Sequence, residues 1–261
     1  MSKFSWIARH ALLCGILVGG AACSTTGTNK GRIVSNSERA DLYLESAQAA
    51  FRDGDLPATF QALNQAEELK PKNVEIHHLR ALAFYARQEL KNAEAAIRRA
   101  LDLQPKASNL KTTLGRVLLD LGRDREAIPV LEEAGKDPVY GEAYKPLTSL
   151  GIHYYRLNQL KEAKREFDRA IQLQPQFACL AYYYRGHLDL KEGKTTEALV
   201  NYTQATKSFC GGFADAHYAI GLVYQRTKQY SLARQKFLEV RQLFPNSALA
   251  AQALDQLKVI P

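Results

Sequence analysis

The sequence lacks every short catalytic motif that can be recognised by its spacing. It contains no HExxH, GxSxG or GxGxxG motif and no phosphate-binding P-loop. Its 4 cysteines form no CxxC pair and have no histidine at zinc-finger spacing. His77 and His78 are adjacent, so on a helix they would point about 100° apart, a poor geometry for a shared metal. We therefore expect no enzyme activity, no metal and no cofactor.

Long runs of one charge are also missing. The formal net charge of +8 comes from 35 Lys and Arg against 27 Asp and Glu, and the two signs are interleaved along the 261 residues. A protein that binds nucleic acid usually gathers its basic residues into a run or patch. We expect an ordinary solvated surface and no nucleic-acid partner. Glycine and proline are not enriched, and 46% of the residues are hydrophobic, which is enough for a buried core.

The N-terminal residues have the pattern of an export signal. Lys3 and Arg9 precede the apolar stretch 11–22, ALLCGILVGGAA, which ends in small residues. Twelve helical residues reach about 18 Å, short of the roughly 30 Å core of a bilayer. We predict a signal peptide at 1–22 that is removed from the mature protein.

The end of this segment resembles a bacterial lipobox, in which a small residue and Gly or Ala precede a lipid-modified Cys. Ala21, Ala22 and Cys23 fit the pattern, and Gly20 stands where Leu is usual. The alternative is ordinary cleavage after Ala22. The resemblance implies acylation of Cys23, and Ser24 (rather than Asp) after it implies the outer membrane. Several acyl chains on one Cys would anchor the protein stably. Residues 23–37 are polar and predict a flexible tether between the anchor and the body.

From residue 38 onward the chain repeats itself. Prolines at 71, 105, 138 and 175 follow one another at intervals of 34, 33 and 37 residues, with Pro245 further on. Phrases such as AFYARQELKNAEAAIRRALDLQP and YYRLNQLKEAKREFDRAIQLQP recur between them. The pattern resembles the tetratricopeptide repeat, a helix–turn–helix unit of about 34 residues. It implies an all-α, right-handed solenoid at 38–261, with repeats at approximately 40–73, 74–107, 108–141, 144–177, 179–212 and 214–247 and a capping helix at 247–259.

Small residues recur where two helices of a repeat must approach closely. The eighth position of the first helix (helix A) holds Ala47, Ala81, Gly115, Gly151, Gly186 and Gly221. Large residues recur on the second helix (helix B), among them Leu131, Phe167, Tyr202 and Phe237. The residues 138–143, PVYGEA, form a longer connection, where we expect a local change in the pitch of the solenoid.

Two cysteines bracket the fifth repeat. Cys179 opens it, and Cys210 stands where other repeats have proline. Because helices A and B are antiparallel, the start of A lies beside the end of B, so the two thiols should be neighbours. In an oxidising compartment they would form a disulfide, worth roughly 3–4 kcal/mol in the chain-entropy model. Two buried free thiols are the alternative.

An apolar stripe follows the positions of helix A that usually face the inside of such a solenoid. It includes His187 and Leu222, and the residues that we predict for partner binding are Leu44, Phe51, Leu82, Tyr85, Leu119, Ile152, Tyr155, Tyr183 and Tyr218. Exposed apolar area usually marks a partner site, although part of it could pack between repeats. Basic residues near the stripe, among them Arg116 and Arg156, do not form the paired set that binds acidic C-termini in some repeats. We expect an amphipathic helix or an extended segment as the occupant.

The whole layout resembles the outer-membrane pilotin lipoproteins of type IV pilus systems, the PilF/PilW/Tgl group. The resemblance rests on a leader with a lipobox-like Cys23, a short tether, six repeats and the cysteines around the fifth. It implies a non-enzymatic protein at the periplasmic face of the outer membrane. Its partners would be the inner leaflet, through the lipid, and the pilus secretin, whose insertion and multimerisation it would assist. A general envelope scaffold, serving peptidoglycan hydrolases or outer-membrane assembly, is the alternative.

Overall fold

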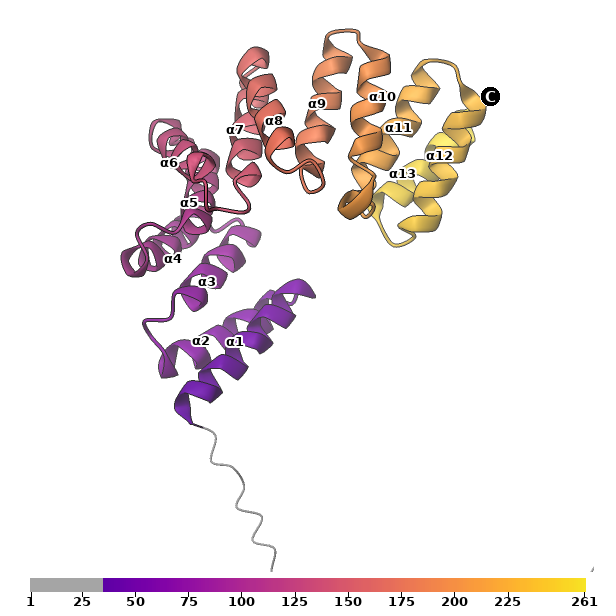
Figure 1. Ribbon diagram of the computed structural model, residues 1–261. Coiled ribbons are helices and arrows are strands. Elements are labelled where there is room, and N and C mark those ends of the chain that lie inside the picture. The colour runs from indigo at the N-terminus through magenta and orange to yellow at the C-terminus, as the bar shows by residue number, and fades with distance from the viewer. Residues whose placement is uncertain (1–34) are drawn as a thin grey trace, which may run out of the picture. The chain divides into compact units, whose positions relative to one another are not determined.

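The computed structural model describes residues 35–261, and all regular secondary structure in this range is helical (Figure 1). The all-α prediction is therefore confirmed. The predicted signal peptide 1–22, Cys23 and the tether up to residue 34 lie outside the described residues.

Within 35–261 the helices form six hairpins and a final single helix. The helices A are α1 (Asn36–Arg52), α3 (Val74–Ala86), α5 (Ser108–Asp120), α7 (Tyr144–Arg156), α9 (Cys179–Lys191) and α11 (Ala214–Arg226). The helices B are α2 (Leu56–Leu69), α4 (Leu90–Leu103), α6 (Asp124–Lys136), α8 (Leu160–Leu173), α10 (Thr195–Gln204) and α12 (Tyr230–Leu243). A short 3₁₀ helix, η1 (Ser208–Cys210), follows α10, and α13 (Ala248–Val259) ends the array.

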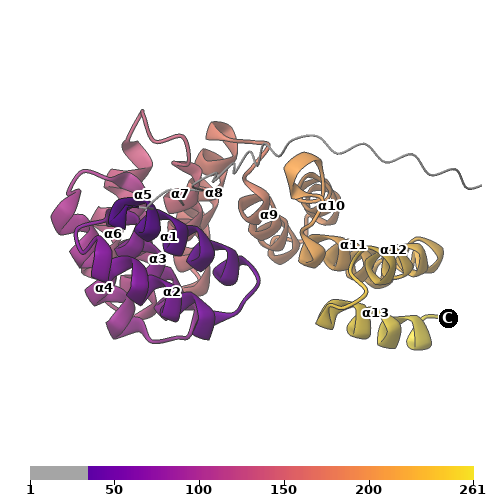
Figure 2. The ribbon, with the colours of Figure 1, turned by 90° about the horizontal axis from the view of Figure 1, so that it is seen from below.

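Each hairpin packs on the next one in chain order, as Figures 1 and 2 show. The two helices of a hairpin have the most extensive contacts, and helix B then packs against helix A of the following hairpin. Helices α3, α5, α7 and α9 also contact one another in sequence, whereas successive helices B do not approach comparably. The helices A of the second to fifth hairpins thus form one continuous inner face, as expected for a solenoid of helical hairpins.

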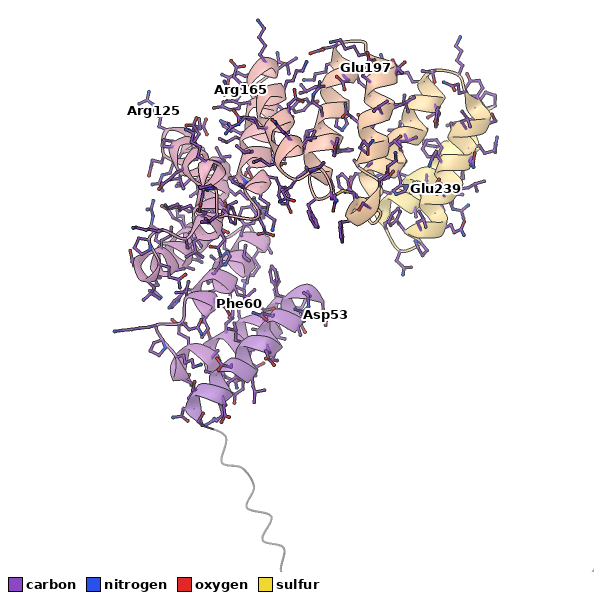
Figure 3. The ribbon with its side chains drawn as sticks, in the orientation of Figure 1. Asp53, Phe60, Arg125, Arg165, Glu197 and Glu239 are labelled. Atoms are coloured by element: carbon purple, nitrogen blue, oxygen red, sulfur yellow. A yellow bond between two sulfur atoms is a disulfide. The ribbon has the colours of Figure 1, made fainter. Side chains whose placement is uncertain are left out.

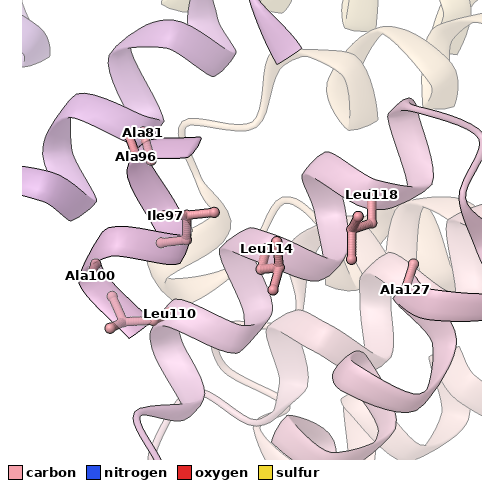
Figure 4. Packing of buried hydrophobic residues seen from close by; sticks show 8 residues of the cluster. All are labelled: Ala81, Ala96, Ile97, Ala100, Leu110, Leu114, Leu118 and Ala127. Carbon is pink, nitrogen blue, oxygen red and sulfur yellow. The ribbon is translucent and has the colours of Figure 1, made fainter. Parts of the chain in front are cut away.

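The core is built from small residues that let helices approach and from large ones that fill the space between. One cluster, shown in Figure 4, joins Ala81 of α3 and Ile97 of α4 to Leu110 and Leu114 of α5, all buried. In the fourth hairpin Gly151 of α7 faces Phe167 of α8, whose side chain is fully buried. A methyl group on Gly151 would lie 2.5 Å from the Phe167 ring, so the ring occupies the space that a side chain would need.

Every A–B turn contains one residue with a positive φ angle. The residues are Gly54, Gln88, Gly122, Asn158, Gly193 and Lys228, with φ between 59° and 78°. Only glycine adopts this region at little cost, so the turns with Gln88 and Lys228 are held by the packing of their helices. The repeated angle gives the same chain reversal in all six hairpins.

The fifth hairpin departs from the others at its end. Helix α10 has 10 residues, whereas the other helices B have 13 or 14. The chain then leaves the helix through Ser208, with φ of 53°, and η1 brings Cys210 back to Cys179. Helix α10 ends early, and the residues after it bring Cys210 beside the start of α9.

Two ends of elements are defined more closely by the structure. Helix α1 begins at Asn36, two residues inside the segment predicted as tether, and is 17 residues long. The last helix is capped by Ser247, whose hydroxyl accepts a hydrogen bond from the Ala250 N–H at 3.1 Å.

Candidate partner-binding site

A cavity of about 630 Å³ opens on the inner face, across helices α3, α5, α7 and α9. Its aliphatic wall consists of Leu82, Leu119, Ile152 and Leu180, one from each helix. Aromatic side chains complete the wall: Tyr85, Tyr140, Tyr144, Phe177 and Tyr184. The size is in the range of cavities that hold a small ligand or a few residues of a peptide.

Polar contacts link successive repeats along one side of this cavity. The Tyr85 hydroxyl donates a short hydrogen bond to Asp120 Oδ2. The other oxygen of Asp120 accepts from Arg156 Nη1 at 3.4 Å. The Arg116 guanidinium lies over the Tyr85 ring, 5.0 Å from its centroid. These contacts span three helices, so they fix the spacing of α3, α5 and α7 around the opening.

His78 joins α3 to α5 within the cavity lining. The Thr113 hydroxyl donates to the Asn109 carbonyl at 3.2 Å, so at 2.9 Å it accepts from His78 Nε2, which carries the proton. Burial, and then the charge of Lys145, lower the pKa of His78 from its ordinary value. His78 is therefore neutral at neutral pH and adds no charge to the cavity.

The charged residues of the cavity have a small positive excess. The cations are Arg116, Lys145 and Arg156, and the anions are Asp120 and Glu142. Glu142 is paired with Lys145, and Asp120 is held by Tyr85 and Arg156. Among the described residues no carboxylate forms an ion pair with Arg116, whose side chain is exposed.

Stacked aromatic rings extend the cavity towards the fifth hairpin. The Phe177 ring stacks on Tyr144 at 6.5 Å and on Phe209 at 4.5 Å between centroids. Phe177 is 42% exposed and Phe209 69%. Such exposure is unusual for Phe, and the row adds an apolar rim to the opening.

The predicted partner-binding residues fall into three groups. Leu82, Tyr85, Leu119 and Ile152 line the cavity. The prediction for Leu44 is wrong. Its side chain is 5% exposed, because it packs against α2 and against Ile76 and Leu79 of the next hairpin. The remaining four, Phe51, Tyr155, Tyr183 and Tyr218, lie outside the cavity lining and are partly buried against core clusters.

Tyr183 belongs to an aromatic cluster that packs α9. Its ring lies 4.4 Å from that of His187, and His187 Nδ1 is 3.0 Å from the Tyr202 hydroxyl of α10. Burial raises the pKa of Tyr183 to about 12, and burial followed by the charge of Lys191 lowers that of His187. Both groups are neutral at neutral pH, as suits residues that hold two helices together.

Three aromatic residues that line the cavity were not among the predicted ones: Tyr140, Tyr144 and Phe177. Tyr140 and Phe177 lie in the connections between repeats, and Tyr144 is the first residue of α7. Inward positions of helix A do not include the connections between repeats. The available signal was an aromatic residue two positions after a linker proline, as in Pro138–Tyr140 and Pro175–Phe177.

Cys179 and Cys210 form a disulfide, with the Cα atoms 5.4 Å apart and a sequence separation of 31. Figure 3 draws the side chains of this region. The bridge ties the start of α9 to η1, and Cys179 lies two residues after Phe177 while Cys210 directly follows Phe209. It therefore supports the aromatic rim of the cavity.

The described part of the chain has neither a metal-binding cluster nor a membrane-spanning helix. Residues 35–261 contain no group of three His, Cys, Asp or Glu side chains suited to a metal ion. No helix in that range is both long and apolar enough to cross a bilayer.

Comparison with protein families identifies the repeat. Residues 145–177 match one tetratricopeptide repeat family, and residues 78–141 and 183–248 match another of the same description. Together these segments cover more than half of the chain. They include all or part of the second to sixth hairpins.

Solved structures with the same fold cover most of the chain. One is PilW, described as a widely conserved type IV pilus biogenesis factor, with a TM-score of 0.64, 19% identity, and coverage of 82% of this chain and 98% of that one. Another is pilF of Pseudomonas aeruginosa, with a TM-score of 0.63, 20% identity, and coverage of 85% and 99%.

A curated relative is subunit 6 of the anaphase-promoting complex from Arabidopsis thaliana. It is 27% identical over 148 residues, which is 56% of this chain and 26% of the relative. The chain spans about a quarter of the length of the curated relatives it matches.

Proposed function

The chain belongs to the tetratricopeptide repeat family, and on this basis we propose that it is a non-enzymatic, pilotin-like lipoprotein. It binds the secretin of a type IV pilus and promotes its insertion and multimerisation in the outer membrane. The protein acts by holding its partner in place, since the described residues form a binding cavity on the inner face of a solenoid of helical hairpins.

The cavity across α3, α5, α7 and α9 is the observation that carries the binding role. It combines aliphatic and aromatic walls with a few fixed polar groups, which is the usual composition of a site that recognises part of another molecule. It is formed by four successive repeats, so an elongated partner segment can contact several of them at once.

The assignment to pilus assembly is supported by architecture. PilW and pilF are matched over nearly their whole lengths, so the number and order of helical hairpins are similar. The N-terminal sequence adds an export signal and a lipobox-like Cys23. Acylation of Cys23 would place the repeats at the periplasmic face of the outer membrane, where a secretin is assembled.

Deletion of the gene tests the pilus role. We expect the deletion strain to lose heat-stable secretin multimers on an immunoblot while secretin monomer remains. The wild-type gene should restore the multimers, and a Cys23→Ser gene should restore them poorly because the anchor is missing. Normal multimers in the deletion strain would rule out the pilotin role.

Substitutions in the cavity test the binding role. The double substitution Leu82→Glu and Ile152→Glu places two charges on the apolar wall, and we expect it to abolish co-precipitation of the secretin. Both side chains are partly exposed, so the helices should still form, which circular dichroism checks. Unchanged co-precipitation would show that the secretin binds elsewhere.

A general envelope scaffold is the second candidate. The tetratricopeptide fold alone is compatible with it, as the curated relative from a different assembly illustrates. Crosslinking from a photoreactive residue at position 119, inside the cavity, would capture a peptidoglycan hydrolase or an outer-membrane assembly protein in that case.

A further inference from the structure

Arg116 lines the cavity from α5, between helices α3 and α7. It is the ninth residue of α5, and the ninth residues of the two adjacent helices A are Leu82 of α3 and Ile152 of α7. All three line the cavity. A cation is therefore placed between two aliphatic side chains, one on each neighbouring repeat.

Among residues 35–261 no acid forms an ion pair with this cation. Asp120 is engaged by the Tyr85 hydroxyl and by Arg156, and Glu142 by Lys145. Arg116 packs against the Tyr85 ring face, which orients the guanidinium but leaves most of its five N–H donors for another group. A carboxylate is the partner that this planar, oriented donor set binds best.

We propose that the cavity recognises an extended peptide segment in which an internal Asp or Glu is flanked by apolar residues. The carboxylate pairs with Arg116, and the apolar side chains rest on Leu82 and Ile152. This inference rests on the proposed binding role and specifies the chemistry of its partner. The positive excess of the cavity and the unpaired state of Arg116 supply the charge complementarity.

Helix spacing predicts where the flanking residues stand. Packed helices lie roughly 8–10 Å apart. In a polyproline II segment, residues three positions apart point to the same side and are separated by about 9 Å. The expected pattern is therefore apolar, two residues of any type, Asp or Glu, two residues of any type, apolar.

A peptide selection tests this pattern without knowledge of the natural partner. The mature protein with its disulfide intact is immobilised, and random 12-residue peptides displayed on phage are selected against it. We expect enriched peptides to share the apolar–acid–apolar pattern. A synthetic version of an enriched peptide should bind the Arg116→Glu variant at least ~10-fold more weakly, because a charge-assisted hydrogen bond is lost and repulsion replaces it.

Arg125→Glu is the matched control. Arg125 belongs to α6 of the same hairpin, is exposed, and points away from the helices in Figure 3. This variant has the same charge change and should bind the peptide as the wild type does. Arg116→Gln is a second variant in case the glutamate disturbs folding, and circular dichroism checks both.

A double-mutant cycle isolates the contact. Replacing the peptide's acid by its amide should weaken binding to the wild type but hardly affect binding to Arg116→Gln. The proposal is overturned if no peptide is enriched, if the enriched peptides lack an internal acid, if binding needs only a free C-terminal carboxylate, or if Arg116→Glu and Arg125→Glu bind alike. Normal secretin multimers in the deletion strain together with the expected peptide pattern would refute the pilus role and leave this inference standing.

Discussion

At the residue scale, the close approach of helices A and B depends on one small side chain in each hairpin. Gly115, Gly151, Gly186 and Gly221 each face a large buried residue of helix B, and a methyl group at any of them would lie under 3.0 Å from that residue. The pairs Gly151–Phe167 and Gly186–Tyr202 show the same design with different rings. The small and the large residue are therefore complementary, and neither can change alone.

Replacing Gly151 by Ala should destabilise the protein by up to about 2 kcal/mol. Alanine gains about 1 kcal/mol of helix propensity over glycine, but overpacking of a rigid core costs typically 1–3 kcal/mol, and three atoms of the Phe167 ring lie at 2.5–3.0 Å from the new methyl. The urea midpoint measures the change. Gly141→Ala is the control, because nothing lies within 4 Å of its Cβ. Equal midpoints for both variants would contradict the packing argument.

Two histidines should titrate below their ordinary pKa of about 6.5. Burial lowers the pKa of both, with Lys145 as the second cause at His78 and Lys191 at His187. Imidazole NMR signals measure each pKa. Lys145→Gln should raise the pKa of His78 and leave that of His187 unchanged, and Lys191→Gln should do the reverse. A shift of both pKa values by either variant would contradict these assignments.

The same shifts set a direction for stability against pH. The unfolded chain binds more protons than the folded one between the lowered pKa values and about 6.5, so folding stability rises with pH in this window and is lost on acidification. Urea midpoints at pH 7.5 and 5.5 would show this fall.

Part of the site could be predicted from the sequence at this scale. The register of helix A identified Leu82, Tyr85, Leu119 and Ile152, because inward positions recur with the repeat. The register placed Leu44 on the partner-binding surface, but its side chain packs against Ile76 and Leu79 of the next hairpin and is buried there. The lack of an ion pair at Arg116 could not be predicted from the sequence either. It depends on the contacts of the nearby acids, since Asp120 is bound by Tyr85 and Glu142 by Lys145.

At the element scale, the fifth hairpin has a shorter helix B than the other hairpins and a disulfide that links its two ends. Helix α10 ends at Gln204, and the residues after it form a turn, η1 and the disulfide. The helical register and the antiparallel hairpin predict that the two cysteines approach. They do not predict that α10 must end early, because this requires the path through Ser208 at φ of 53°.

Replacing both cysteines by serine should lower the free energy of unfolding by about 2–4 kcal/mol, since a loop of this length is released in the unfolded chain. The loss should be local. Hydrogen exchange of α9 and α10 should accelerate, whereas α3 and α4, which belong to another hairpin, serve as internal controls. Uniform acceleration along the whole chain would indicate one cooperative unit instead.

At the scale of the whole array, the stability is approximately the sum of the stabilities of single hairpins and of the interfaces between adjacent hairpins. The principal contacts of each hairpin are with the ones before and after it, and the last hairpin is covered by α13. Ala253 and Ile260 close the cluster around Phe237 and Val240 of α12. The helical repeat pattern made this architecture predictable, because each hairpin obeys the same small set of packing rules.

Removing residues 247–261 should therefore unfold the array from one end. We expect α11 and α12 to lose protection against hydrogen exchange, because Phe237 and Val240 become exposed, while α1 to α4 keep theirs. Mass-resolved exchange of the shortened chain measures this. Loss of protection in α1 would show that the hairpins do not behave as nearest neighbours.

The disulfide also makes one hairpin of the array less extensible under force than the others. A chain pulled from its two ends should extend hairpin by hairpin, but the loop closed by Cys179 and Cys210, which are 31 positions apart, cannot lengthen while the bond is intact. At about 3.3–3.6 Å per residue, roughly 100 Å of contour length stays hidden until a reductant is added. Optical tweezers would record that difference as an increase in the extended length after reduction.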